Sequence, residues 1–346
     1  MERLNTLEYT PGVLWLLDQT RLPGEMVITG VRTVPQAVEA IAKLRVRGAP
    51  AIGVAAAYAL CLSAHGAQAL PNAEFAALFE RDAGALAASR PTAVNLFWAI
   101  ARMKEVFSRC AGQDTPNVIA ALEDEARRME IEDGEVNRAI GENLLSLLHD
   151  GDTVLTHCNA GALATTRYGT ALSPFYLAQE RGMKLRVYAD ETRPLLQGAR
   201  LTAFELHRAG IDVTLICDNM AASVMAQGEI QAVITGCDRV AANGDTANKI
   251  GTMGVAILAR HFGIPFYIAA PTSTIDMRCA SGTDIPIEQR GEDEVACFAG
   301  VRTAPEGIKV YNPAFDVTPA DLITAIVTER GIVRPPYGAG LKALME

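Results

Sequence analysis

Beyond Gly151, short runs of apolar, β-branched residues alternate with longer stretches in which apolar residues recur at helical spacing. The short runs are typical of parallel strands that are covered on both faces, because such strands are almost continuously apolar. We predict five strands, at TVLT from Thr153, LRVYA from Leu185, VTLI from Val213, AVIT from Ala232 and PFYIAA from Pro265. Helices are predicted between them, at residues 164–182, 198–210, 219–228 and 250–262. This alternation predicts an α/β fold with a Rossmann-like, doubly wound, mainly parallel sheet.

The first part of the chain is rich in alanine and has a different pattern. Helical spacing is clear at residues 83–88 and 93–102, and the main strand signal is EMVITG around Val27. The most apolar run, Pro50 to Ala64, is shorter than the roughly 18 residues that a bilayer requires. We therefore interpret it as a buried helix and expect no membrane association.

An amphipathic stretch from Val118 to Leu148 looks like a connector, and we expect it to be broken at Gly134 and Gly141. We accordingly predict two domains. Residues 1–125 form a small, mostly helical N-terminal domain with short strands, and residues 126–346 form the Rossmann-like catalytic domain.

The composition excludes several classes of protein. With a formal net charge of −9 and no run of Lys and Arg, the chain offers no basic track for nucleic acid. The N-terminus lacks the basic start and apolar stretch of a secretory signal, so we expect a cytoplasmic protein. Seven cysteines without a C-x-x-C pair indicate individual thiols, and five histidines without ligand spacing predict no metal site.

The residues that follow the predicted strands carry the candidate chemistry, because ligands of open α/β sheets bind beyond the carboxyl ends of the strands. These residues are His157 and Cys158, Asp190 and Glu191, Cys217 and Asp218, and Cys237 and Asp238. Acid–base catalysis needs two groups that face one substrate. We take Cys158 and Asp238 as that pair.

Structural alternatives exist for each of these residues. A strand-end cysteine is often a small core residue, and an aspartate often caps a helix. His157 fits a hydrogen-bonded core histidine, and we interpret Cys217 and Cys237 as packing residues.

Two segments are candidate anion sites. In RVRGAPAIG, Arg47 and Gly48 precede a helix with Pro50 in its first turn, which is also compatible with a plain helix start. In NGDTANKIGT, Asn248 and Lys249 lie before the next helix, where they could cradle a phosphate. Neither segment is a P-loop, and no G-x-G-x-x-G supports dinucleotide binding.

The motifs together resemble the methylthioribose-1-phosphate isomerase family. They run in the family's order from about Arg45 to Pro319, as RGAPAIG, SRPTAVNLFWA, THCNAGALAT, ETRPLLQGARLTAFEL, GCDRVAANGDTANKIGT, AAPTSTID and NPAFDVTP. The wider family includes ribose-1,5-bisphosphate isomerase, deoxyribose-phosphate isomerases and regulatory subunits of translation initiation factor 2B. Two positions depart from its usual pattern, with Cys237 in place of Ala and Met253 in place of Tyr.

The resemblance implies a homodimeric enzyme of methionine salvage that works without metal or cofactor on a small sugar phosphate. It would convert 5-methylthioribose 1-phosphate into 5-methylthioribulose 1-phosphate. Cys158 and Asp238 match the catalytic pair. The positions that match substrate contacts are Arg47, Gly48, Ala49, Arg90, Gln197, Asn248 and Lys249.

The chemistry suggests roles for these residues. We expect Asp238 to act as general acid/base in a site closed against water, where burial would raise its pKa, and Cys158 to assist from the opposite face. The phosphate would lie among Arg47, Arg90 and Lys249. Two alternatives remain open: an isomerase of 5-deoxyribose 1-phosphate or ribose 1,5-bisphosphate, and a non-catalytic subunit like those of initiation factor 2B.

Overall fold

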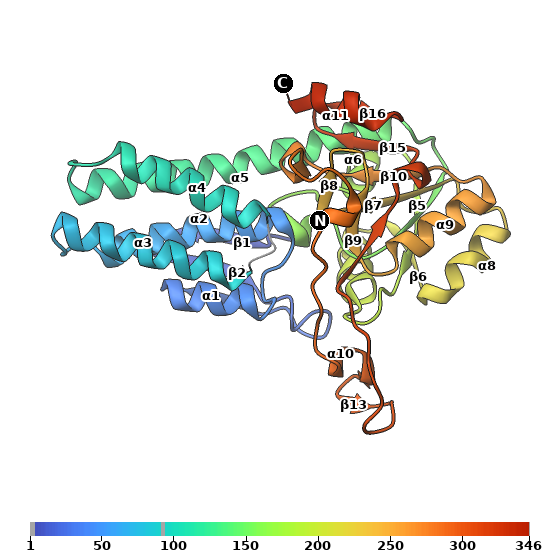
Figure 1. The fold of residues 1–346 in the computed structure, drawn as a ribbon, viewed down its shortest axis with the longest axis horizontal. Coiled ribbons are helices and arrows are strands. Elements are labelled where there is room, and N and C mark those ends of the chain that lie inside the picture. The colour runs from blue at the N-terminus through green and yellow to red at the C-terminus, as the bar shows by residue number, and fades with distance from the viewer. Residues whose placement is uncertain (1–3, 91–93, 346) are drawn as a thin grey trace. The chain divides into compact units, whose positions relative to one another are not determined.

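A computed structural model describes residues 4–90 and 94–345. The chain divides into two compact units, coloured from blue to red along the chain in Figure 1. The N-terminal unit comprises Met1–Asn137 and Gly161–Gly169, and the sheet unit comprises Arg138–Ala160 and Thr170–Glu346.

The N-terminal unit combines a small antiparallel sheet, in the order β1-β2-β3, with a layer of helices. Its strands are β1 (Leu7–Thr10), β2 (Val13–Leu17) and β3 (Ile28–Val31). Its helices are α1 (Val34–Ala42), α2 (Ala49–Gly66), α3 (Asn72–Ser89), α4 (Val94–Arg109) and the first part of α5 (Thr115–Leu145). Strand β3 was predicted, whereas β1 and β2 were missed. Their hairpin signal was the pair Pro11-Gly12, in which Gly12 adopts a φ of +80°.

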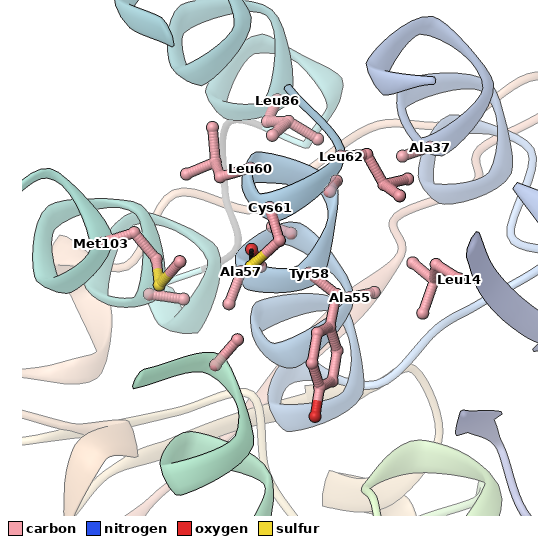
Figure 2. Close-up of a cluster of buried hydrophobic side chains, with 14 of the residues drawn as sticks. Leu14, Ala37, Ala55, Ala57, Tyr58, Leu60, Cys61, Leu62, Leu86 and Met103 are labelled. Carbon is pink, nitrogen blue, oxygen red and sulfur yellow. Dashed lines mark hydrogen bonds between the residues drawn. The ribbon is translucent and has the colours of Figure 1, made fainter. Parts of the chain in front are cut away.

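Helix α2 forms the centre of this unit's core. Every residue from Ala51 to Ala64 is buried, which confirms the predicted buried helix. Figure 2 shows α2 side chains such as Leu60 and Cys61 among residues of β2, α1, α3 and α4. Among the described residues, α2 is the helix that is long and apolar enough to cross a membrane. A helix that is apolar on all sides fits equally well inside a protein core, where α2 lies.

The sheet unit contains a seven-stranded sheet in the order β16-β15-β10-β7-β4-β5-β6. Its strands are β4 (Thr153–Thr156), β5 (Arg186–Asp190), β6 (Asp212–Ile216), β7 (Ala232–Gly236), β10 (Phe266–Ala269), β15 (Ala325–Thr328) and β16 (Gly331–Val333). All pairs are parallel except β15 with β16. The five predicted strands and the Rossmann-like fold are therefore confirmed.

Helices and shorter elements complete the sheet unit. The helices are the end of α5, α6 (Ser173–Glu180), a π-helical turn η2 (Gly198–Thr202) that leads into α7 (Ala203–Arg208), α8 (Ala221–Ala226), α9 (Thr252–Phe262), α10 (Asp293–Ala296) and α11 (Tyr337–Met345). A second sheet has the order β11-β8-β9-β14, with β8 (Arg239–Ala241), β9 (Thr246–Lys249), β11 (Ile275–Asp276) and β14 (Phe315–Thr318). Strands β12 (Cys297–Phe298) and β13 (Val301–Arg302) form a hairpin.

The strand order reverses between β4 and β7. From β4 the chain continues outward to β5 and β6, and from β7 it continues in the opposite direction to β10 and β15. Such a reversal opens a crevice beyond the carboxyl ends of the two central strands, where doubly wound folds bind ligands. Cys158 follows β4 and Asp238 follows β7, so each follows one of the strands that flank this point.

The helix predicted at residues 164–182 is wrong in its first half. Residues 161–169 instead form a loop of the N-terminal unit, with a short 3₁₀ turn (η1) at Ala162–Ala164. The hydroxyl of Thr165 donates to the carbonyl of Arg167, and Tyr168 adopts a φ of +66°. Local side-chain hydrogen bonds of this kind compete with helix formation, which spacing alone does not reveal.

The loop is held within the N-terminal unit by hydrogen bonds. Thr6 Oγ1 donates to the Ala162 carbonyl at 2.7 Å, and Gln19 Nε2 donates to the Leu163 carbonyl at 2.7 Å. Thr166 donates to the Asp133 carboxylate from both its N–H and its hydroxyl, at 2.7 and 2.6 Å.

The connector is one continuous helix. Helix α5 runs through both Gly134 and Gly141, so the predicted breaks are absent. The boundary expected near residue 125 lies inside α5, and the units divide after Asn137. The two glycines meet different surroundings. A Cβ on Gly141 would lie 2.8 Å from Ser173 Cβ, whereas a Cβ on Gly134 would lie 3.7 Å from Arg167.

We therefore expect opposite effects from alanine at the two glycines of α5. Gly141→Ala should lower the free energy of unfolding by about 1–3 kcal/mol, because the new methyl group overpacks the contact with α6. Gly134→Ala should raise it by about 0.5–1 kcal/mol, since alanine favours a helix and has room there. Urea unfolding of both variants provides the measurement. Equal effects would contradict the packing described for Gly141.

Candidate active site at the switch point of the sheet

Cys158 occupies an unusual backbone conformation at the end of β4, with a φ of +67°. Its N–H donates to Thr192 Oγ1 at 2.8 Å, and its carbonyl accepts from Thr202 Oγ1 at 2.6 Å. The residue is half-buried. A non-glycine residue at positive φ costs free energy and persists only where its surroundings hold it. Two threonines therefore fix the direction in which the thiol leaves the strand.

Further hydrogen bonds fix Thr192. Its hydroxyl donates to the Asp190 carbonyl at 3.1 Å. The N–H groups of Thr192 and Arg193 each donate to the Asp218 carboxylate at 2.7 Å. A Cβ on Gly198 would lie only 1.6 Å from the Asp190 carbonyl, so the chain there accepts no larger residue. The motif ETRPLLQGAR thus supports the backbone of Cys158.

His157 lies on the strand side of Cys158 and is buried, as the core-histidine interpretation expects. Its Nδ1 lies 2.9 Å from Asp190 Oδ2, and its Nε2 lies 2.9 Å from the Ile250 carbonyl. Burial by itself lowers the pKa of His157, but the hydrogen bond and charge of Asp190 outweigh it and the pKa is raised. Burial also raises the pKa of Asp190, and His157 opposes that rise.

His157, Asp190 and Asp218 are close enough to suggest an ion site, since their potential ligand atoms lie within 4.8 Å of one another. Most of these atoms already have partners. Asp218 accepts two backbone N–H groups, and Nδ1 of His157 faces Asp190. Within this cluster, Oδ1 of Asp190 is a buried atom that has no hydrogen-bond partner among the described residues. The cluster is better described as a hydrogen-bonded network.

Asp238 follows β7, where its N–H donates to the Ala247 carbonyl at 2.8 Å. Asp238 is exposed in the structure, and a site closed against water stays a prediction. The chain leaving β7 packs closely against the chain leaving β4. A Cβ on Gly236 would lie 2.5 Å from Ala160 Cβ, so glycine permits this approach. The strand ends that carry Cys158 and Asp238 are therefore neighbours.

Three of the expected substrate contacts lie in the sheet unit and are buried. Gln197 precedes η2, and its Oε1 has no hydrogen-bond partner among residues 4–90 and 94–345. Asn248 donates to Thr252 Oγ1 at 3.0 Å. Lys249 donates from Nζ to the Ala314 carbonyl at 2.7 Å, and its ammonium lies 4.8 Å from the centre of the Phe315 ring.

The N–H groups at the start of α9 already bind a carboxylate of the protein, that of Asp316. The carboxylate of Asp316 accepts the N–H of Gly251 at 2.8 Å and the N–H of Met253 at 3.2 Å. A phosphate at this helix start would therefore compete with Asp316 for the same donors. Any contribution of this segment to phosphate binding falls to Lys249 and Asn248 rather than to the helix terminus.

The other expected contacts lie in the N-terminal unit. Arg47 is half-buried and precedes Gly48, the N-cap of α2, which has a φ of +90°. A Cβ on Gly48 would lie 2.2 Å from the Ala164 carbonyl oxygen, so the residue must be glycine for two reasons. Ala49 is the first residue of α2, and Arg90 is the half-buried C-cap of α3. Residues 91–93, in the motif that contains Arg90, lie outside the described part of the chain.

Comparison with known proteins places the chain in a family. The Initiation factor 2 subunit family matches residues 45–335. The chain belongs to this family. The resemblance expected from the motifs is thereby confirmed.

Family members with curated names cover almost the whole chain. A methylthioribose-1-phosphate isomerase of Symbiobacterium thermophilum is 59% identical over 339 residues, which are 98% of this chain and 94% of that protein. A 5-deoxyribose 1-phosphate isomerase of Moorella thermoacetica is 56% identical over 336 residues, which are 97% and 96% of the two chains.

Two solved structures share the fold. A 5-methylthioribose 1-phosphate isomerase from Pyrococcus horikoshii superposes with a TM-score of 0.95 at 44% identity, covering 100% of this chain and 96% of that one. A protein from A. fulgidus described as subunit delta of translation initiation factor eIF-2B has a TM-score of 0.91 at 43% identity, covering 99% and 100%. Similar family members thus bear names of different function.

Sequence reasoning missed the residues that support Cys158. Thr192 and Thr202 both lie in the long motif that follows β5, but hydrogen bonds to a residue distant in sequence leave no periodic signal. Asp316 was also missed. It lies in the NPAFDVTP motif, and its capping role needs the pairing of β14 with β9.

We expect Thr192→Val to destabilise the protein by about 1–3 kcal/mol, because it leaves the N–H of Cys158 without its acceptor. Thr235→Val is the matched control. Thr235 is equally buried in β7, but its hydroxyl has no hydrogen-bond partner in the part of the chain that the structure describes, so valine should be neutral or stabilising. Denaturant unfolding compares the two. Similar losses at both positions would show that the hydrogen bond to Cys158 contributes nothing.

Proposed function

We propose that this protein is an isomerase that converts a pentose 1-phosphate from its aldose form to its ketose form. The observation that carries the proposal is the backbone of Cys158, held at positive φ beside the switch point of the sheet, with Asp238 on the neighbouring strand end. Strained residues of this kind are concentrated at functional sites. The names of the similar isomerases support the same reaction class.

The reaction requires acid–base groups and no external redox partner. An aldose phosphorylated on its anomeric oxygen must open its ring while the phosphate stays attached, so an acid near the ring oxygen assists. A hydrogen then moves from C2 to C1, as a proton through an enediol or as a hydride. C2 is oxidised as C1 is reduced, so electrons balance within the substrate. The reaction accordingly needs no cofactor.

We assign the general acid/base role to Asp238, because its exposed carboxylate is accessible to a substrate in the crevice. Cys158 acts from the β4 side as the second acid/base or as a stabiliser of the transition state. The resemblance assigns Arg47, Arg90 and Lys249 to the phosphate. It also assigns Gly48, Ala49 and Asn248 to substrate contacts.

Gln197 suits a sugar hydroxyl. No described residue donates to its buried Oε1, and buried polar atoms in folded proteins nearly always have a partner. A substrate hydroxyl that donates to this oxygen would complete the hydrogen bonding of the site.

For the substrate we propose 5-methylthioribose 1-phosphate, and hence a place in methionine salvage. The most identical of the relatives described above carries that name. The name of the Moorella relative points to 5-deoxyribose 1-phosphate, which lacks the methylthio group. Cys237 and Met253, the two departures from the family pattern, are candidates for shaping the pocket around C5. A cytoplasmic homodimer remains the accompanying prediction.

Proton NMR with each sugar phosphate, without added metal or nucleotide, tests the substrate. We expect fast conversion of 5-methylthioribose 1-phosphate to its ketose, well above the rate with 5-deoxyribose 1-phosphate. A faster reaction with 5-deoxyribose 1-phosphate would support the proposed isomerisation but contradict the proposed substrate and pathway. No reaction with either sugar, or with ribose 1,5-bisphosphate, would contradict the enzyme and favour a regulatory subunit.

Paired variants test the catalytic residues. Asp238→Asn should reduce kcat by about 10²–10⁴-fold, the usual contribution of a general acid or base. Asp212→Asn is its control, an exposed aspartate at the opposite end of the sheet. Cys158→Ala should likewise reduce kcat, whereas Cys217→Ala, at the end of β6, should not. Near-normal turnover of Asp238→Asn would refute the assigned role.

A further inference from the structure

His157 connects three segments that end at the candidate site. It precedes Cys158 at the end of β4, its Nδ1 meets Asp190 at the end of β5, and its Nε2 meets the Ile250 carbonyl after β9. Gly251 leaves room for the imidazole, because a Cβ there would lie 2.8 Å from both Cε1 and Nε2 of the ring. The backbone after Lys249 therefore packs directly against His157.

The surroundings of the ring favour its charged form. One nitrogen faces the carboxyl group of Asp190 and the other faces a carbonyl, and with Asp190 ionised both groups only accept hydrogen bonds. Both nitrogens must therefore carry a proton for both contacts to be hydrogen bonds. Three carboxylates from different elements interact with the ring: Asp190 of β5, Asp218 after β6 and Asp316 of β14. A cation at His157 balances part of this negative charge.

We propose that His157, clamped between Asp190 and the Ile250 carbonyl, is a positioning residue that holds Cys158 and the segment after Lys249 in register for the isomerisation. Its ring does not have to touch the substrate. It fixes two backbone segments that approach the crevice from different strands. The kinetic part of this inference rests on the proposed function, whereas the state of the ring does not.

The pH dependence follows from the raised pKa of His157. The folded protein holds this proton more tightly than the unfolded chain, whose histidine pKa is about 6.5. The protonated His157 therefore contributes its full stabilisation of the folded protein below a pH of about 6.5. This contribution is lost as the pH rises through the raised pKa of His157. Deprotonation removes the hydrogen bond to one of the two acceptors. Positioning, and with it kcat, should then decline on the alkaline side.

Nitrogen-15 NMR of the histidine rings tests the charge directly. His157→Gln identifies the signal, and His149→Gln is the control, since His149 is an exposed histidine that also faces an aspartate. We expect both nitrogens of His157 to be protonated at pH 7 in the unmodified protein. Asp190→Asn should shift its titration to lower pH. A neutral His157 ring at pH 7 would overturn the proposal.

Kinetics test the consequence. In the unmodified protein, kcat should fall with increasing pH in step with the His157 titration. Asp190→Asn should lower kcat by up to about 100-fold, the cost of small displacements of catalytic groups, and move the alkaline decline to lower pH. His149→Gln should leave both unchanged. A purely structural role would lower thermal stability without moving the pH profile, and that result would refute positioning.

The outcomes separate this inference from the proposed function. If the unmodified protein converts no sugar phosphate, the proposed function fails, and with it the kinetic part of the inference. The NMR titration still decides whether His157 is a cation clamped by Asp190. If the unmodified protein is active and Asp190→Asn shifts the titration without changing the pH profile of kcat, only the positioning role fails.

Discussion

The site depends on how the chain leaves β4. Cys158 turns out of the strand at a positive φ, and this conformation persists because Thr192 and Thr202 satisfy its N–H and its carbonyl. Each threonine comes from the segment after β5, so this segment supports the end of the neighbouring strand β4. The motif ETRPLLQGARLTAFEL therefore holds the backbone of Cys158 in the conformation that it adopts after β4.

Much of the fold could be predicted because the central strands β4, β7 and β10 are buried throughout, and the apolar runs that result are visible without knowledge of tertiary contacts. The edge strand β6 is largely exposed, and its β-branched residues gave the signal instead. The errors lie where tertiary contacts decide. Gly141 looks like a helix breaker in the sequence, but it is the point where α5 packs closely on α6. Residues 164–172 have helical spacing, yet hydroxyl and carboxylate partners hold part of this segment as a loop.

The residues of the candidate site differ in how far the sequence alone points to them. Cys158 and Asp238 follow from the rule that ligands bind beyond the carboxyl ends of parallel strands. Arg90 and Gln197 stand out mainly through the family resemblance, because a single arginine or glutamine has no pattern of its own. The supporting residues could not be predicted at all, since Asp316 caps α9 only once β14 has paired with β9. Such contacts are properties of the completed fold.

The loop of residues 161–169 has a consequence for how this protein could have evolved. It lies in the sequence between two elements of the sheet unit, yet it belongs to the N-terminal unit. A Cβ on Gly48, at the start of α2, would lie 2.2 Å from the carbonyl oxygen of Ala164, so glycine permits the close approach of this loop. A recombination event that exchanged only the first 137 residues would deprive the new N-terminal unit of its matching loop. A single cut in the chain therefore cannot separate the complete N-terminal unit, because one of its segments lies within the sequence of the sheet unit.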